Sequence, residues 1–391
     1  MWFGIATSQS TVSNDQSQSA DVYSDQQLNV DSNSDSTTAV TTSTGNSFVG
    51  STVSGGLDVV SNQAMSGNTV ASTSVSIAQT PGASFLSTTA ATANSGDDVI
   101  SSGWTLTGNV HQSSTGPTVD AEAVTDGANA FATDAATTVQ AVANGQQYGA
   151  TDSSVVANTT QSNTSTVEAN GTGSFNYVSD SVVFSSTAAG NDLTATAAGN
   201  TNQNLGVTQT NNGALTQASM FTVFNSVQSS STSAVATGND VSASNTEGGL
   251  WVTDAQSNSS EVNATAVETA SEFGTAQVTA EGVGNTAVAA NIGPTTGVNN
   301  TQVNAGGVTS LANFTGGDGF DAAVSSSATG NAATGFSCSA CGGVLNAWNS
   351  QSNSGGVSAQ TQVTQTGSGR TTAGVATAAG NTATYYVATP R

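Results

Sequence analysis

The chain has 391 residues, with 25 acidic residues against two arginines and no lysine, which gives a formal net charge of −23. Without clustered basic side chains to neutralise phosphates, nucleic-acid binding and attraction to an anionic membrane surface are excluded. Charged residues make up only 7% of the chain, so most of the polar surface must consist of uncharged Ser, Thr, Asn, Gln and Gly.

Residues 1–36 form an acidic, polar stretch, which we interpret as a solvated segment or an atypical cap of the body that follows. Its carboxylates are spaced among Ser and Gln. No run of about 18 apolar residues occurs, so the sequence predicts no transmembrane helix. Residues 1–8 are too short for the apolar core of a signal peptide, and we expect them to be the remnant of one if the true start lies upstream.

Residues 37–384 predict a body built from repeats, because a Gly-Asn pair recurs through them at steps of 48, 46, 46 and 50 residues. A near-fixed period of this size is typical of repeat architectures, in which no unit can bury its apolar face alone. We expect these residues to occupy corners or stacked ladders. The pairs are Gly190-Asn191, Gly238-Asn239, Gly284-Asn285, Gly330-Asn331 and Gly380-Asn381.

A second set of asparagines falls between the Gly-Asn pairs. Each stands four residues before a Val and six before an Ala, and three of the copies open with Gln-Ser-Asn. Together the two sets imply a half-unit of about 23 residues, and this second set is also expected to form ladder positions. Its members are Asn163, Asn258, Asn299 and Asn353.

Apolar and polar residues alternate within each half-unit, as in Val357, Ala359, Thr361 and Val363, and this period of two predicts half-buried strands. The fold class is therefore all-β: a β-solenoid or β-helix of stacked coils, with about 23 residues per half-repeat and about 46 per full repeat. Coils of 23 residues would number about 17 and form a rod about 80 Å long, since strands stack at about 4.8 Å. The alternative is one 46-residue coil per repeat, which gives a shorter and wider body. Gly and Asn are expected to supply the positive φ of the corners.

The two cysteines, Cys338 and Cys341, supply only half of the four ligands that zinc takes, so the sequence favours a disulfide that pins one loop, with reduced thiols as the alternative. The single histidine, His111, is expected in an exposed turn. With no second histidine for a nucleophile or acid–base scheme, the sequence predicts a protein that is not an enzyme.

Residues 316–321 match the first six positions of the calcium-binding nonapeptide of parallel β-rolls, in which Asp318 and Asp321 would be ligands. That site is built between consecutive copies, and this chain has one copy. Ala323 stands where the motif has a large apolar residue. The sequence therefore predicts no bound cofactor, with Ca²⁺ as the alternative.

Residues 37–46 (TTAVTTSTGN) and 57–63 (LDVVSNQ), with the later Gly-Asn repeats, resemble the D-type holdfast-anchor proteins of stalked alphaproteobacteria. The resemblance implies a secreted, outer-membrane-associated protein that tethers an adhesive polysaccharide to the cell envelope together with sister anchor subunits. It implies no catalytic residues.

We therefore expect an extracellular structural adhesin or anchor whose open coil ends pair with sister subunits or end to end with another copy. Residues 385–391 are expected to be a C-terminal cap or docking strand. A self-assembling, curlin-like amyloid subunit is the second interpretation, because curlin repeats also run about 23 residues with recurring Gln, Gly, Asn and Ala. An S-layer or RTX-type calcium-dependent surface protein is the third.

Overall fold

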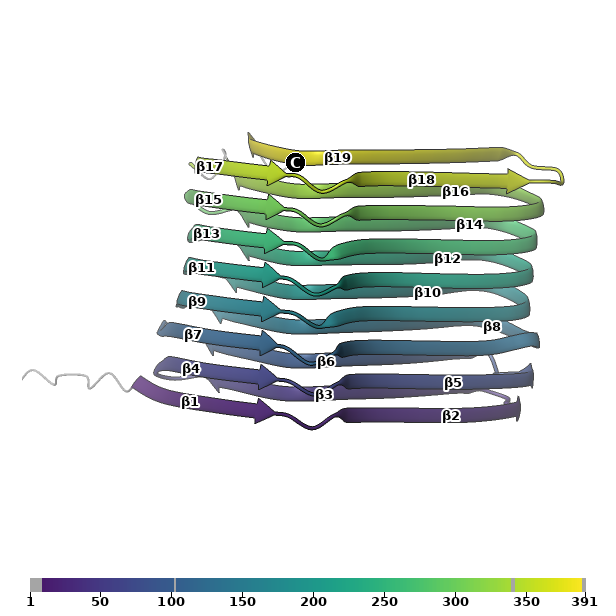
Figure 1. Cartoon of the computed structure of the whole chain (residues 1–391), viewed down its shortest axis with the longest axis horizontal. Helices are drawn as coiled ribbons and strands as arrows, with labels where there is room; N and C mark the ends of the chain where they lie inside the picture. The colour runs from purple at the N-terminus through teal and green to yellow at the C-terminus, as the bar shows by residue number, and fades with distance from the viewer. Residues whose placement is uncertain (1–8, 102, 339–341, 389–391) are drawn as a thin grey trace, which may run out of the picture.

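The computed structural model describes residues 9–101, 103–338 and 342–388, and every regular element in these ranges is a β-strand. All strand pairs in these ranges are parallel, with an in-register pairing that a few local irregularities interrupt, and strands stack on one another in successive layers (Figure 1). The prediction of an all-β solenoid is confirmed.

Eight strands of ten residues each form one sheet, with one strand from each layer, so the described chain makes eight coils. In stacking order they are β1 (Gln9–Gln18), β4 (Gly56–Met65), β7 (Thr105–Ser114), β9 (Ser154–Asn163), β11 (Asn202–Asn211), β13 (Gly249–Asn258), β15 (Thr295–Asn304) and β17 (Val344–Asn353).

The remaining strands of each coil form a second, larger sheet that bends back over the first. In coils 3 to 7 one long strand makes the whole return path, and in the first two coils and the last it is divided in two. The long strands are β8 (Thr118–Thr151), β10 (Thr166–Ala198), β12 (Leu215–Asn245), β14 (Glu261–Asn291) and β16 (Val308–Cys338). The divided pairs are β2 (Val22–Ser32) with β3 (Ser36–Thr52), β5 (Thr69–Thr80) with β6 (Ser84–Ser101), and β18 (Val357–Gln365) with β19 (Thr371–Ala388).

One coil is the full repeat, because strand partners lie about 46 to 50 residues apart. Asn144 lies opposite Asn191, Asn191 opposite Asn239, and Asn285 opposite Asn331. The expectation of 23-residue coils, and with it a rod of 17 coils, is wrong. The two sets of asparagines sit on different strands of the same coil rather than on successive coils. Seven steps of about 4.8 Å give a stack only about 34 Å high.

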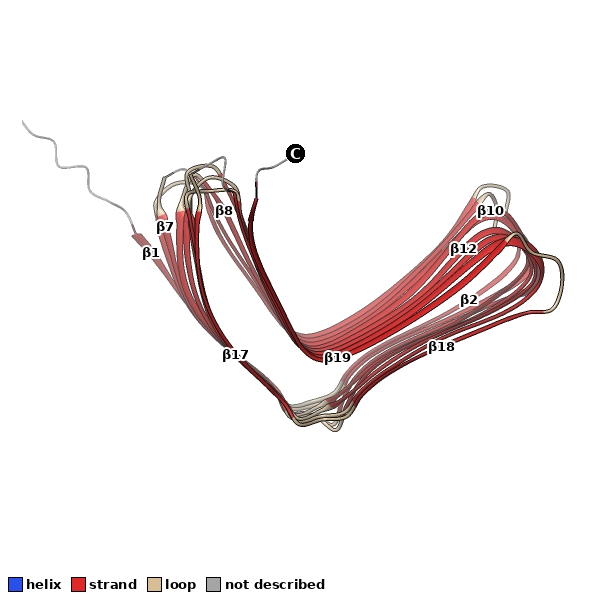
Figure 2. Cartoon of the chain, turned by 90° about the horizontal axis from the view of Figure 1, so that it is seen from above, coloured by secondary structure: helices blue, strands red, loops and turns tan. Residues whose placement is uncertain are grey.

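Each coil has the outline of a V with two arms (Figure 2). The eight-stranded sheet, whose edge strands are β1 and β17, forms the outer layer of one arm. The outer layer of the other arm consists of β2, β5, β18 and the first halves of the long strands. The inner layer runs continuously along both arms. The boundary expected at residue 36 falls inside the first coil, between β2 and β3, and Tyr385 and Tyr386 belong to the last strand, β19.

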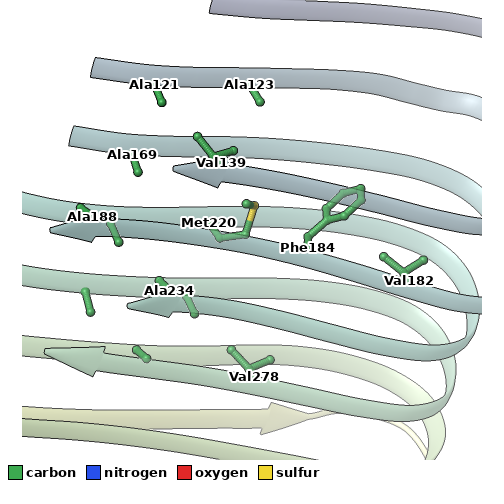
Figure 3. Packing of buried hydrophobic residues seen from close by; sticks show 14 of the residues in the cluster. Ala121, Ala123, Val139, Ala169, Val182, Phe184, Ala188, Met220, Ala234 and Val278 are labelled. Carbon is green, nitrogen blue, oxygen red and sulfur yellow. The ribbon is translucent and has the colours of Figure 1, made fainter. Parts of the chain in front are cut away.

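Each arm encloses its own hydrophobic core, filled from the inward positions of the alternating strands. Phenylalanines pack against one another within and between coils in the arm that contains β18. The rings of Phe175 and Phe184, both on β10, lie 6.4 Å apart, and those of Phe184 and Phe224 in the next coil lie 6.1 Å apart. Alanine and valine fill the narrower layers around them (Figure 3). Leucines such as Leu193 and Leu250 fill the other arm. A polar zone at the vertex separates the two cores.

Candidate functional site

The polar zone at the vertex is built around a column of eight asparagines on the inner layer, one from each coil. Each side-chain amide donates a hydrogen bond of 2.7–2.8 Å to the Oδ1 of the asparagine in the next coil. From Asn46 to Asn331, the same amide also donates to a backbone carbonyl of the outer layer at 2.9–3.0 Å. The column consists of Asn46, Asn94, Asn144, Asn191, Asn239, Asn285, Asn331 and Asn381.

A column of eight glutamines on the outer layer faces the asparagines, and its hydrogen bonds run in the opposite direction along the stack. Each amide donates to the Oε1 of the glutamine in the preceding coil, at 2.7–3.0 Å. Each also donates to a backbone carbonyl of the inner layer, as Gln209 does to Asp240 O at 2.7 Å. The column consists of Gln16, Gln63, Gln112, Gln161, Gln209, Gln256, Gln302 and Gln351. The two columns together tie the inner and outer layers and join every coil to the next.

A shorter asparagine column lies at the ends of the outer strands of coils 4 to 8. Side-chain hydrogen bonds of 2.7–3.0 Å link its members. Three residues of the second predicted set, Asn163, Asn258 and Asn353, lie in it. Asn299 does not: it is exposed on β15 opposite Trp348, and Asn304 takes its place. The expectation for Asn299 was wrong because Val303 and Ala305 imitate the Val-x-Ala spacing, whereas Val308 is the in-register partner of Val262.

The glycine of each of the first four predicted Gly-Asn pairs is needed for close approach between coils, whereas a Cβ on Gly380 in the last coil would meet no atom closer than 3.5 Å. A Cβ on Gly190 would lie 2.5 Å from the carbonyl oxygen of Gly238 and 2.7 Å from Nδ2 of Asn211. The positive-φ glycines of the described chain are Gly55, Gly82, Gly103, Gly199 and Gly342. All five lie between strands, as expected of turn residues, and none belongs to a predicted Gly-Asn pair. The glycines of the Gly-Asn pairs let the inner layer contact the shorter asparagine column of the outer strands.

The ladder positions predicted from the sequence are individual asparagines, and no individual glutamine is among them. The signal was present, because Gln161, Gln256 and Gln351 open three copies of the second set. The members between them, such as Gln209 and Gln302, stand in less regular surroundings, and only the strand register aligns them.

Of the calcium-motif residues, Asp318 accepts hydrogen bonds from the backbone N and Oγ of Ser368 at 2.7 and 2.8 Å, and Asp321 forms an ion pair with Arg370. These partners lower the pKa of both carboxyls. Within the described ranges no group of three His, Cys, Asp or Glu side chains is placed to hold a metal ion.

The remaining candidates lie apart from the vertex. Cys338 ends β16 and is disulfide-bonded, while Cys341 lies outside the described residues. His111 is exposed and lies within β7 rather than in a turn. The described part of the chain has no helix that could cross a bilayer.

Several carboxyls are buried inside the arms, a feature that the sequence alone did not reveal. Burial raises the pKa of Glu268 to about 7, although Ser230 and Thr232 donate to its oxygens at 2.5 and 2.7 Å. Burial raises the pKa of Asp254 well above its usual value, and neither of its oxygens has a hydrogen-bond partner among the described residues. Burial thus favours the protonated, uncharged form of these groups in the folded coil.

The first and last coils of the described chain each leave one row of strands without a neighbouring coil on their outer side (Figure 1). At the first coil Val22 and Leu28 are half-buried against the core, and at the last coil Val357 and Val363 are. Within the described residues the asparagine column ends at Asn381, which accepts a bond from Asn331.

A family model described as holdfast attachment protein D matches residues 31–307, more than half of the chain. The resemblance carried by residues 37–46 and 57–63 lies within this range and is confirmed. No curated protein and no solved structure matches the chain.

Proposed function

Because the chain belongs to the holdfast attachment protein D family, we propose that it is an extracellular anchor that tethers an adhesive polysaccharide to the bacterial outer membrane. The family match over residues 31–307 is the observation that carries this proposal. The family is one of attachment proteins, which supports a structural role without catalysis.

Coils joined by hydrogen bonds of both the backbone and the side chains suit a protein that bears mechanical force. Pulling one coil from the next requires breaking the backbone bonds of both layers together with the side-chain bonds of the amide columns. At Asn239 these are one bond from Asn191 and one to Asn285. Such bonds are individually modest, but in parallel they resist force collectively.

The coil ends supply the contacts with neighbouring subunits, either sister anchor proteins or further copies of this chain. Thirty residues separate Gln16 from Asn46 in the first coil, and thirty separate Gln351 from Asn381 in the last. Both columns of one copy therefore continue into the next when a first coil stacks on a last coil. Val22 then covers Val357, and Leu28 covers Val363.

Charge favours the same polar order. The first coil, residues 9–52, carries five aspartates and no basic residue, whereas the last, residues 344–388, carries no acidic residue and has Arg370. Two first coils repel one another, and a first coil meets a last coil without repulsion. This observation also favours the curlin-like alternative of a self-assembling subunit, as the means by which the anchor extends.

Stacking is tested by sedimentation of the purified protein. Val363→Lys places a charge on the last coil and is expected to abolish assemblies larger than the monomer. Val223→Lys, at a valine that is 55% exposed on the side of β12, is the matched control. Equal assembly of both variants would contradict stacking through the coil ends.

Anchoring is tested by deleting the gene and counting cells that retain the adhesive polysaccharide under shear. We expect the deletion strain to release polysaccharide that still adheres to surfaces, and the wild-type gene to restore retention. Normal retention in the deletion strain would overturn the proposal, and so would loss of polysaccharide synthesis itself.

A further inference from the structure

The long strands turn back at the closed end of the arm that contains β18, and an open trough of about 380 Å³ lies across this bend. The bend closes this arm in Figure 2. In β10 a register irregularity falls between Val178 and Ser181. The trough runs along the stacking axis from coil 4 to coil 8, between Tyr177 and Ser368.

The floor and the rim of the trough are two neighbouring columns of the same strands. Val178, Val227 and Phe273 lie opposite one another in register and are at most 5% exposed, so they form an apolar floor. The adjacent column forms the rim and consists of Tyr177, Ser226, Glu272 and Asp318.

Two aromatic rings mark the length of the trough. Tyr177 in coil 4 is 42% exposed, and Phe320 in coil 7 is 61% exposed. Three coil steps of about 4.8 Å separate their strand positions by about 14 Å. The ring of Phe131 lies 6.2 Å from that of Tyr177 and extends the aromatic surface beyond the trough. Exposed rings offer flat apolar faces on which a pyranose ring can stack.

Two carboxylates, Glu272 and Asp318, face solvent on adjacent coils between these rings. No cationic side chain lines the trough. The nearest one, Arg370, is paired with Asp321 and lies over the ring of Phe320, 5.9 Å from its centroid. Hydroxyl and amide groups from Ser226, Gln228 and Ser368 complete the lining.

We propose that this trough binds a segment of polysaccharide that carries free, protonated amino groups. The sugar rings stack on Tyr177 and Phe320, and the ammonium groups lie against the carboxylates of Glu272 and Asp318 and the aromatic faces. The proposal rests on the anchoring function, and it names the sugar chemistry and the surface that this function uses.

A glycan fits this surface better than a basic peptide does. A peptide bound to a sheet gains much of its affinity from backbone hydrogen bonds at a free strand edge. The strands under the trough are paired on both sides with neighbouring coils, as β12 is with β10 and β14. Recognition must therefore come from side chains, and those present are rings, carboxylates, hydroxyls and an amide.

Binding is measured calorimetrically with three probes: a glucosamine hexasaccharide, its fully N-acetylated form and hexalysine. We expect the wild type to prefer the glucosamine form. The double variant Glu272→Gln, Asp318→Asn should weaken that binding about five- to tenfold, because solvent screens both exposed ion pairs and keeps each of them modest. The double variant Glu122→Gln, Glu281→Gln removes the same charge from exposed sites elsewhere and should retain binding.

The rings are tested in the same way. Tyr177→Ala and Phe320→Ala should each weaken glucosamine binding, while Phe221→Ala, at a 44% exposed phenylalanine on the side of β12, should not. Equal losses in the two double carboxylate variants would mean attraction by net charge alone, and equal losses in the trough and control ring variants would mean that no particular ring is recognised; either result would overturn the proposal. Preference for hexalysine that depends on the trough carboxylates, or for the N-acetylated sugar, would also overturn it.

Experiments in cells distinguish failure of this inference from failure of the anchoring function. If the trough variants fail to bind the sugar and their cells shed polysaccharide, both proposals stand. If the purified wild type does not bind the glucosamine probe while gene deletion still sheds polysaccharide, the trough proposal fails and the anchor stands. If the protein binds the probe through the trough but deletion has no effect on retention, the anchoring function fails alone.

Discussion

Replacing Asn239 with alanine probes the amide columns at their centre. In the wild type this side chain donates to Asn285 Oδ1 at 2.8 Å and to Ser257 O at 2.9 Å, and it accepts from Asn191 Nδ2 at 2.7 Å. Alanine leaves these three groups without their partner at a site where Asn239 has no solvent exposure. Each buried polar group left without a partner costs about 1–3 kcal/mol, so we expect a loss of about 3–5 kcal/mol in the free energy of unfolding.

The matched control is Asn381→Ala, at the exposed end of the same column, where only the bond from Asn331 is lost. Its expected cost is below about 1 kcal/mol, because water replaces the missing partner. Both variants are compared by urea denaturation followed by circular dichroism. Equal destabilisation by the two variants, or none by Asn239→Ala, would refute the view that buried amide columns hold the coils together.

Three further predictions concern the packing and charge of the coils. Gly238→Ala should lower the free energy of unfolding by at least about 2 kcal/mol in the same urea assay, because the new Cβ would lie 2.6 Å from Asn258 Oδ1 and would also contact the carbonyl of Gly284. Burial raises the pKa of Glu268 and Asp240 to about 7, above their unfolded values, so stability should be highest below about pH 4 and fall as the pH rises towards 7. Glu268→Gln should flatten that fall, and a wild-type midpoint that rises over this range would contradict the assignment. Asp254→Asn should raise the unfolding midpoint at pH 8, because burial disfavours the charged carboxylate that an amide would replace. Its in-register neighbour is already an asparagine, Asn300, which bonds to Asn349. A lower midpoint would show that the carboxyl itself is required.

The sequence predicted the solenoid because its two signals are local. Alternation along each strand reports which residues face a core, and the Gly-Asn spacing reports the return of the chain to the same corner. Coil length was harder to predict, because two asparagine sets at half-period offsets look like successive coils. Whether Asn163 lies above Asn144 or beside it depends on which strands pair, and that is a property of the folded chain.

The candidate surfaces were less accessible from sequence. Tyr177 and Glu272 lie 95 residues apart, and Phe320 follows Glu272 by a further 48 residues. Their local surroundings are unrelated, and only the register brings them to one trough. Burial of Glu268 was equally hidden, because its strand alternates as its neighbours do and the hydroxyls that receive it come from β12. Asn299 illustrates the opposite error, in which a correct spacing occurs by coincidence.

The central claim is that this chain anchors polysaccharide by stacking through its coil ends. The most direct measurement is the fraction of cells that keep their adhesive polysaccharide under flow when a deletion strain carries the Val363→Lys or the Val223→Lys form at equal protein levels. We expect Val223→Lys to restore retention and Val363→Lys to leave the cells shedding. Full retention with Val363→Lys would contradict the claim.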